Sequence, residues 1–265
     1  MSTIFKPIAH SWIAIHSKPI GVVEFIGGAL FGSVPIVSYD YFLRSLYEAG
    51  YTIIALPFRF GLDHQYIAET LLAERDDVFK HIADSHQGLP RFWVGHSLGC
   101  KYIVLLEAAS KIWDQPSLLI APDISDTKDA VPLPLVPELL DNIGGGVKPT
   151  RQETQTIIEQ SNLFNLTALI SFDKDKVAGT ASEPVEESDV ALFIDELEGK
   201  KNRKLLKKEI PGKHEEIVGL RVHNLDGSVS FVDIDLTDGI FEKPKERQLE
   251  PLAIEFLKEL GDKLK

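Results

Sequence analysis

One short segment of the sequence has the residue types and the spacing of a nucleophilic site. Residues 95–99 read Gly-His-Ser-Leu-Gly, between the apolar run 92–94 and a mostly apolar stretch at 101–109. This pattern predicts a strand, a sharp turn that carries Ser97, and a helix. The flanking glycines would relieve crowding in such a turn, and a serine at a helix N-terminus is well placed to attack a carbonyl carbon. An ordinary turn that happens to hold a serine is the other interpretation of so short a motif.

A serine hydroxyl is a weak nucleophile, so a base should lie beside it. His214 is the best candidate, because it follows the strand expected at 204–210 and the pair Pro211-Gly212. His223 is an alternative inside a predicted hairpin. His96 adjoins the serine, but its neighbouring position points it elsewhere, so we expect it to pack rather than react.

The base in turn needs a carboxylate to orient it. Asp173 and Asp175 are the candidates, because they lie in a turn directly after the apolar strand expected at 166–172. Each could equally be a surface carboxylate of that turn. The chain thus offers a serine, an acid and a histidine in that order.

A glycine-rich turn upstream could supply part of an oxyanion hole. The apolar strand 20–26 ends in Gly27-Gly28-Ala29-Leu30. The backbone of such a turn can direct an N–H group at a substrate oxygen. We expect Ala29 to be this donor, with Leu30 as the alternative, and Leu98 after the serine to be the second donor. A phosphate-binding loop is disfavoured, because neither G-x-G-x-x-G nor G-K-[ST] occurs.

Short apolar strands alternate with helices along much of the chain. Ser38 and Asp63 are expected to cap two helices, the first of which would end at Gly50. The alternation predicts a doubly wound, mainly parallel α/β sheet with helices on both faces, in a single domain of residues 1–265. Strands are expected at 9–16, 20–26, 52–56, 92–94, 117–121, 166–172 and 204–210.

Residues 122–149 break this alternation, because they hold five prolines and the run 144–146 of three glycines. A loop of this length inside a compact domain is usually functional. We expect residues 122–165 to form a cap or lid over the site, with Thr150 and Glu153 as a capping box. Some apolar residues of the loop either line an acyl pocket or anchor it to the body: Leu133, Leu135, Val136, Leu139 and Leu140.

The C-terminal part departs from the simplest pattern. A hairpin is expected within 217–236, around the turn 224–227, before a last helix at about 246–260. Its pairing, with the main sheet or with another subunit, is open, as is the oligomeric state.

Composition excludes several classes of function. The chain has 28 basic and 40 acidic residues, a net charge of −12, which should repel nucleic acid. Cys100 is the single cysteine, so no intrachain disulfide forms and a reducing, cytoplasmic location is expected. No apolar run reaches about 18 residues, so we expect no transmembrane helix. No metal or other cofactor is expected, because His10 and His16 lack ligand spacing and no H-E-x-x-H occurs.

The one basic run lies between residues 200 and 208. It is either a solvated loop and strand edge or a weak contact with an anionic lipid surface. The residues are Lys200, Lys201, Arg203, Lys204, Lys207 and Lys208.

Together these motifs resemble the α/β-hydrolase superfamily over nearly the whole chain. The resemblance favours Asp175 over Asp173, because 172–177 is similar to G-x-x-D-x-x-V of that fold, with Phe172 at the first glycine. A closer resemblance is to an uncharacterised hydrolase-like family of cyanobacteria and plant chloroplasts, which implies no substrate. It also draws attention to Asp63-His64, as a helix cap with packing or as a wall of the site. The segments that carry it are 25–32 with Tyr39, 55–58, 62–64, 67–68, 95–99 and 172–175.

The sequence therefore predicts a serine hydrolase that cleaves a small-molecule carboxylic ester or thioester. Ser97 would be the nucleophile, His214 the base and Asp175 the orienting acid, with Leu98 and Ala29 as oxyanion donors. The alternative is a non-catalytic α/β-hydrolase scaffold that binds a protein or lipid partner.

Overall fold

The computed structural model describes the chain in nine stretches. These are residues 4–29, 31–112, 115–125, 146–161, 166–199, 205–223, 229–234, 241–242 and 247–264. Side chains of the strands between residues 220 and 242 are not part of the description.

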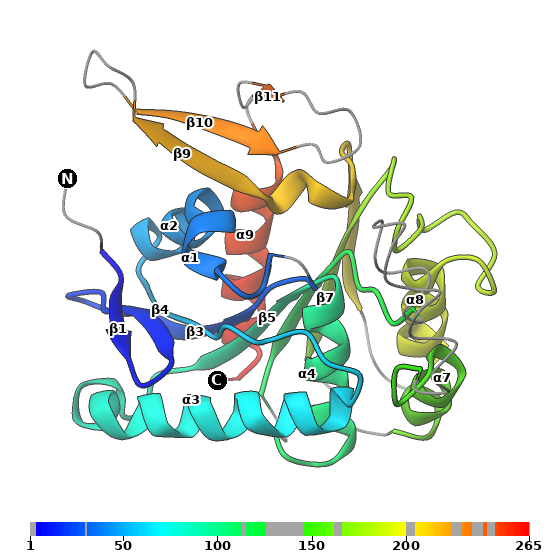
Figure 1. The fold of residues 1–265 in the computed structure, drawn as a ribbon, viewed down its shortest axis with the longest axis horizontal. Coiled ribbons are helices and arrows are strands. Elements are labelled where there is room, and N and C mark those ends of the chain that lie inside the picture. The colour runs from blue at the N-terminus through cyan, green and yellow to red at the C-terminus, as the bar shows by residue number, and fades with distance from the viewer. Residues whose placement is uncertain are drawn as a thin grey trace.

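In the described chain, eight strands form one main sheet (Figure 1). They are β1 (Lys6–Ile8), β2 (Ser11–Ala14), β3 (Gly21–Ile26), β4 (Tyr51–Ala55), β5 (Arg91–His96), β6 (Ser117–Ile120), β7 (Thr167–Phe172) and β8 (Leu206–Ile210). Their order is β1-β2-β4-β3-β5-β6-β7-β8. The pairs from β4 to β8 are parallel, whereas β1, β2 and β4 pair antiparallel. Because parallel strands end at one edge, the loops after β3, β5, β6, β7 and β8 meet there.

Helices cover both faces of this sheet. Their bounds are α1 (Pro35–Ser38), α2 (Asp40–Glu48), α3 (His64–His86), α4 (Leu98–Ala108), α7 (Arg151–Gln160), α8 (Asp189–Gly199) and α9 (Leu249–Asp262). Figure 1 shows α3 and α4 on one face and α2 and α9 on the other, with α7 beside α4. None of the described helices is both long and apolar enough to cross a bilayer.

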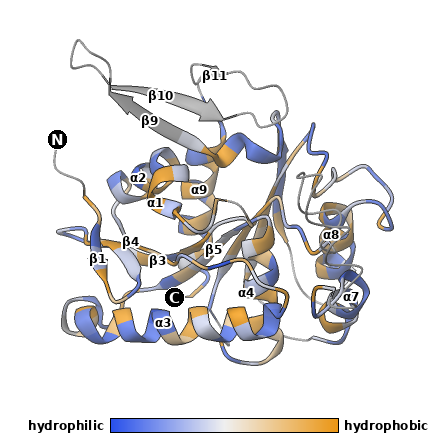
Figure 2. Ribbon diagram, viewed as in Figure 1, coloured by the Kyte–Doolittle hydropathy of each residue, from blue (hydrophilic) through white to orange (hydrophobic). Residues whose placement is uncertain are grey.

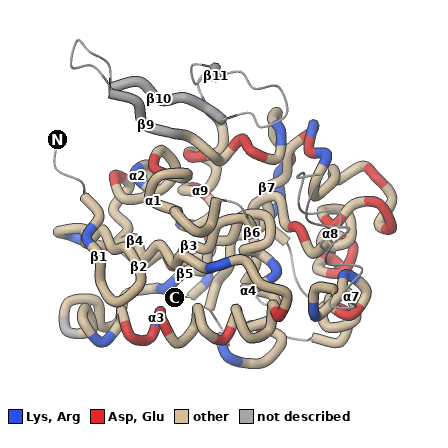
Figure 3. Tube along the Cα trace, in the orientation of Figure 1, with Lys and Arg blue, Asp and Glu red and all other residues tan. Residues whose placement is uncertain are grey.

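The core lies between these layers. Every residue of β3, β4, β6 and β7 is buried, as expected for parallel strands covered on both faces. Figure 2 shows hydrophobic residues along the central strands and a mixture of both kinds along α3. The buried face of α3 has residues at helical spacing, among them Ile67, Leu71, Val78 and Ile82. Charged residues gather on the outer helices and loops instead (Figure 3).

The C-terminal hairpin forms its own sheet. β9 (Gly219–His223) and β10 (Val229–Ile234) pair antiparallel, and β11 (Phe241–Glu242) adds a third strand that the sequence pattern did not predict. β9 lies against α1 and α2, away from the main sheet (Figure 1). Within the described chain the hairpin joins neither edge of the main sheet, which excludes the first of the two predicted pairings.

Several local predictions can be compared with the structure. Asp63 caps α3 by accepting from Tyr66 N at 2.9 Å, and Thr150 with Glu153 forms the predicted capping box of α7. The prediction for Ser38 was wrong. Ser38 ends α1, and Tyr39 occupies the N-cap position of α2. Pro35 explains the difference, because proline favours the first turn of a helix and starts α1 early.

Candidate active site

The turn after β5 has the strained geometry expected for a nucleophile. Ser97 is the N-cap residue of α4 and has φ 53° and ψ −126°, which is unusual for a residue with a Cβ. The turn is held by the Ser97 amide, which donates to Ile120 O at 3.1 Å, and by Cys100 N, which donates to Ser97 O at 2.9 Å. The side chain does not cap the helix. The hydroxyl is therefore left for other partners at the sheet edge.

The two glycines of the motif are required by close backbone approaches. A Cβ on Gly95 would lie 2.8 Å from Ile103 Cδ1 and 2.9 Å from Cys100 N. A Cβ on Gly99 would overlap the carbonyl oxygens of Ile26 and Gly27. The start of α4 is thus pressed against both its own strand and the end of β3.

Asp175 and His214 are brought together by the turns after β7 and β8. Asp175 Oδ2 lies 2.9 Å from His214 Nδ1, and both residues are buried. The other oxygen, Oδ1, accepts from the amides of Val177 at 2.8 Å and Ala178 at 2.9 Å. These bonds fix the carboxylate, which in turn fixes the imidazole plane.

Asp173 has a different role. It is exposed, and its Oδ1 accepts from Gly212 N at 3.0 Å. Its own amide donates to Ile210 O at 3.1 Å, so Asp173 ties the turn after β7 to the turn that leads to His214. Geometry therefore places Asp175, and not Asp173, against the histidine.

The charges around His214 favour its protonated form. Burial acts to lower the pKa of His214, but the hydrogen bond to Asp175 opposes it, followed by the charges of Asp175, Asp123 and Glu215. The net effect raises the pKa of His214 above its ordinary value. A histidine with these partners is a candidate for proton transfer.

The loop after β3 lies beside Ser97. Phe25 pairs with Val94 and Ile26 with Gly95, so β3 and β5 end together. A Cβ on Gly28 would lie 3.1 Å from Ser97 Cβ and 3.4 Å from Ser97 Oγ. A Cβ at this position would press on the serine by a few tenths of an ångström, so glycine suits the close approach.

Ser97 and His214 both follow strands that end at the same edge of the sheet. Within the described chain, no hydrogen bond joins Ser97 Oγ to the His214 ring. The rings of His96 and His214 have centroids 5.0 Å apart, so the base lies next to the residue that precedes the serine. Catalytic hydrogen bonds often tighten only when a substrate binds.

Asp123 is a site residue that the sequence interpretation missed. It is 2% exposed, its amide donates to Ser97 O at 3.4 Å, and its charge acts on His214. Ser125 donates to its Oδ1 from both the amide and the hydroxyl. A signal was present in the sequence, because Asp123 follows the strand expected at 117–121 by two residues.

Lys101 is a second missed residue, and it lies one helical turn after Ser97. Its side chain is fully buried, and Nζ donates to Ile124 O at 3.3 Å and to Pro149 O at 2.8 Å. The two carbonyls lie within the region 122–165 that is expected to form the cap, one before and one after residues 126–145. No sequence pattern marks this role, because a lysine in a helix is normally exposed.

His64 is buried, as its position after the Asp63 cap allows. Among the described residues its ring nitrogens meet no partner with good hydrogen-bond geometry, although the Gly61 backbone acts on the ring. The His64 ring meets the Tyr102 ring edge-on, with centroids 5.4 Å apart. Burial, helped by the charge of Lys101, lowers the pKa of His64 to about 3. The imidazole is therefore neutral and packs against α4.

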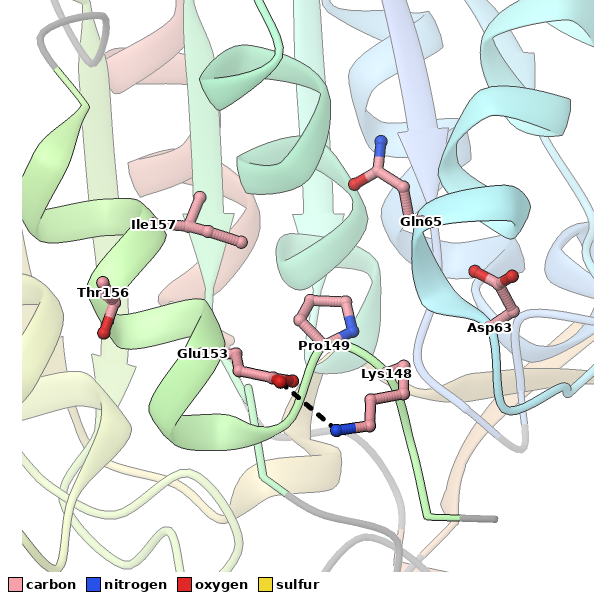
Figure 4. A pocket seen from close by; sticks show the side chains of 7 residues that line it. All are labelled: Asp63, Gln65, Lys148, Pro149, Glu153, Thr156 and Ile157. Carbon is pink, nitrogen blue, oxygen red and sulfur yellow. Dashed lines mark hydrogen bonds and ion pairs between the residues drawn. The ribbon is translucent and has the colours of Figure 1, made fainter.

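A surface pocket of about 520 Å³ lies between the start of α3 and α7 (Figure 4). Lys148 and Glu153 form an ion pair of 3.2 Å across it. The lining residues are Asp63, Gln65, Lys148, Pro149, Glu153, Thr156 and Ile157. Since none of Ser97, Asp175 or His214 lines it, this pocket is not the place of the predicted chemistry.

Some predicted features lie outside the described residues. They include Leu30, residues 126–145 with all five apolar positions suggested for an acyl pocket, and Lys200, Lys201, Arg203 and Lys204 of the basic run. Of that run, Lys207 is described on β8, where it pairs with Glu198 at 2.7 Å. Among the described residues, no group of three or more potential side-chain ligands could hold a metal ion.

Comparison with solved structures places this architecture in a known class. Carboxyl esterase 2 from the fungus Tuber melanosporum is 12% identical over 96% of this chain and 81% of its own, with a TM-score of 0.57. An S-formylglutathione hydrolase from Agrobacterium tumefaciens is 10% identical over 96% and 90%, with a TM-score of 0.54. A fluorophosphonate-binding serine hydrolase of Staphylococcus aureus is 14% identical over 77% and 85%, with a TM-score of 0.51. The chain has the α/β-hydrolase fold, which confirms that prediction.

The family follows from the sequence itself. The model of a family described as "Protein of unknown function (DUF1350)" matches residues 5–259. The chain therefore belongs to this family, which agrees with the predicted resemblance to an uncharacterised hydrolase-like family. Among curated proteins, none matches the sequence.

Proposed function

We propose that this protein is a serine hydrolase that cleaves a small-molecule carboxylic ester or thioester through an acyl-enzyme. The observation that carries the proposal is the buried pair of Asp175 and His214, at the same sheet edge as the strained Ser97. A carboxylate, an imidazole and a serine hydroxyl are the three groups that acyl transfer of this kind requires. The described relatives in fold include a carboxyl esterase and an S-formylglutathione hydrolase, in keeping with this reaction class.

In the first half-reaction, His214 Nε2 removes the proton of Ser97 while the serine oxygen attacks the acyl carbon. Asp175 holds the other ring nitrogen and stabilises the imidazolium. The amides of Leu98 and Ala29 bind the oxyanion, and each contributes on the order of 3 kcal/mol. His214 then returns the proton to the leaving alcohol or thiol, and in the second half-reaction it activates the water that releases the acid.

The region 122–165 would form the cap over this site within a single domain of residues 1–265. Two described parts of this region support the proposal, because Lys101 of α4 donates to Ile124 in one and to Pro149 in the other. An acyl pocket lined by the apolar residues of that region stays a prediction, as does the cytoplasmic location.

A fluorophosphonate probe tests the proposal directly, because it labels activated serines. We expect the wild-type protein to be labelled and Ser97→Ala to be unlabelled. Ser110→Ala is a matched control, since Ser110 lies just beyond the other end of α4 and also has a positive φ, of 56°. It should label like the wild type.

An ester panel then defines the substrate class. We expect p-nitrophenyl and acyl-thioester substrates of graded chain length to be hydrolysed with a Ser97-dependent rate. If neither labelling nor hydrolysis depends on Ser97, the protein is not a serine hydrolase, and the non-catalytic scaffold is the better account.

A further inference from the structure

A network of three buried hydrogen bonds connects residues around Ser97. Gly28 N donates to Tyr39 Oη at 2.7 Å, Tyr39 Oη lies 3.0 Å from His96 Nδ1, and His96 Nε2 lies 3.0 Å from His214 O. All four residues are buried. This hydrogen-bond network therefore links the loop after β3, the start of α2, the end of β5 and the turn that carries His214.

With a neutral His96 ring, only one arrangement of protons satisfies this hydrogen-bond network. The His214 carbonyl can only accept, so His96 must carry its proton on Nε2. Burial, with the charge of His214, lowers the pKa of His96 well below its ordinary value, so its ring is neutral and Nδ1 is an acceptor. Tyr39 must then donate to Nδ1, while its oxygen accepts from Gly28. Burial also raises the pKa of Tyr39, which keeps this hydroxyl protonated.

At Gly28, the hydrogen-bond network determines which backbone amide is left to face the substrate. Gly28 lies against Ser97, but its N–H is taken by Tyr39. Its carbonyl accepts from Gly32 N at 2.7 Å, which closes the turn. Ala29 is the next residue, and among the described residues its amide has no acceptor. Because the Gly28 N–H is occupied and Leu30 lies outside the described residues, Ala29 has a described amide of this turn that remains to bind an oxyanion.

At its other end, the hydrogen-bond network holds the backbone of His214. His214 begins a short 3₁₀ turn, η1 (His214–Ile217), and its ring is fixed through Nδ1 by Asp175. The bond from His96 fixes its carbonyl as well. Because both its ring and its carbonyl are held, the His214 side chain is restricted from rotating away from Ser97.

We infer that Tyr39 and His96 are positioning residues of the proposed hydrolase site, which hold the Ala29 amide and His214 in register with Ser97. This inference rests on the proposed function, since it assigns the two residues to the same reaction. Neither residue is placed against the substrate. They act through hydrogen bonds to the residues that are.

Nuclear magnetic resonance tests the proton arrangement without any catalysis. In protein labelled with ¹⁵N-histidine, the His96 ring, assigned by its loss in His96→Asn, should be protonated at Nε2 and unprotonated at Nδ1. This state should persist from about pH 8 to about pH 5, where an ordinary imidazole becomes charged. Protonation of Nδ1 anywhere in this range would overturn the inference.

Tyr39→Phe tests the positioning role, because it removes the hydroxyl and keeps the ring packed against Phe25. Loss of an aligned oxyanion donor should lower kcat by about 10- to 100-fold, with KM changed by less than about threefold. The Gly28 amide should also exchange its hydrogen faster, since it loses its acceptor. Tyr102→Phe is the matched control, because that buried hydroxyl has no hydrogen-bond partner. It should change none of these quantities.

The outcomes separate the two proposals. If Tyr39→Phe behaves like Tyr102→Phe in kcat and in Gly28 exchange, the positioning role is wrong. If Tyr39→Phe does not fold, the His96 tautomer in the wild type still decides the inference. If the wild type shows the expected His96 tautomer and a protected Gly28 amide but no Ser97-dependent labelling, the proposed function fails. The hydrogen-bond network then stands as a structural feature.

Discussion

Two buried carboxylates in the same sheet are used in different ways. Glu24, on β3, accepts from Arg91 Nε and Nη2 at 2.8 and 2.7 Å, and Arg75 Nη1 lies 3.6 Å away. Asp175, after β7, faces His214 at 2.9 Å. Both carboxylates are essentially inaccessible, so burial alone does not distinguish their roles. Burial, against the charge of Arg75, raises the pKa of Glu24 to about 8.

The partners and the positions do distinguish them. Arginine never releases its proton in a protein, so the partners of Glu24 do not titrate, whereas the partner of Asp175 is a histidine. Its guanidiniums are also covered by rings, with Arg91 Cζ 3.7 Å from the Phe79 centroid and Arg75 Cζ 5.3 Å from that of Trp93. Glu24 lies within its strand beneath α3, whereas Asp175 lies beyond a strand end. A buried charge is therefore a candidate for catalysis when its partner titrates and the pair lies at the sheet edge.

The largest expected effect breaks the proposed chemistry. Ser97→Ala and His214→Ala should each lower kcat/KM by at least about 10⁴-fold, because each removes a group that the reaction needs. The double variant should be no worse than about twofold below either single variant, as for residues that act as a unit. Ester hydrolysis measures the rates, and circular dichroism checks that the fold is kept. Additive losses would contradict a shared mechanism.

A somewhat smaller loss should separate the two neighbouring aspartates. Asp175→Asn should reduce kcat by about 10³- to 10⁴-fold, because an amide cannot stabilise the imidazolium or fix the correct tautomer. Asp173→Asn is the matched control, since an amide oxygen can still accept from Gly212. It should stay within about twofold of the wild type. Equal losses in the two variants would show that the turn, rather than the carboxylate against His214, matters.

The Glu24 cluster should respond in stability rather than in activity. Glu24→Gln leaves Arg91 without its charged partner and Arg75 with Asp76 alone. Breaking a buried pair in this way costs about 3 kcal/mol. Because burial raises the pKa of Glu24 to about 8, the full loss is expected above that pH. Urea denaturation should show this loss in the free energy of unfolding. Fluorophosphonate labelling of the folded variant should proceed at the wild-type rate. A large change in labelling would mean that the two clusters are coupled.

The elements of the fold were largely predictable because local patterns determine them. The parallel strands are continuous apolar runs, Asp63 and Thr150 cap their helices as predicted, and the glycines at 95 and 99 mark the elbow. Element ends were less predictable. The predicted strand 9–16 contains β2, whereas β1 lies before it and was not predicted. The chain reverses between the two strands at Ala9, which has a φ of 52° that its residue type does not predict.

Residues of the candidate site were predictable only where they belong to a sequence motif. The sequence pointed to Ser97, Asp175 and His214 through their places after strands, and the structure brings the last two together. It gave no role to Tyr39, whose hydroxyl reaches His96 across 57 positions of the chain. Contacts of this kind depend on which loops meet in space, which a single sequence does not contain.

The smallest predicted effect concerns Asp123, the carboxylate that shares the sheet edge with Asp175. His214 must be neutral to act as a base, and its raised pKa places the acid limb of kcat/KM above the pH at which an ordinary imidazole titrates. Four groups face it: Asp175, Asp123, Glu215 and His96. Asp123→Asn removes one charge that raises the pKa, so the acid limb should move to lower pH.

This shift should be small, because the hydrogen bond and charge of Asp175 act more strongly on His214 than Asp123 does. A raised histidine pKa stabilises the fold below the pKa of the unfolded chain, and this stability is lost as pH rises through the folded pKa. Asp123→Asn should therefore also reduce the stability gained on acidification. Ser125→Ala is the control, since it removes a hydrogen bond to Asp123 and keeps the charge. If the control moves the pH profile as far as Asp123→Asn does, the position of the loop, and not the charge of Asp123, acts on the base.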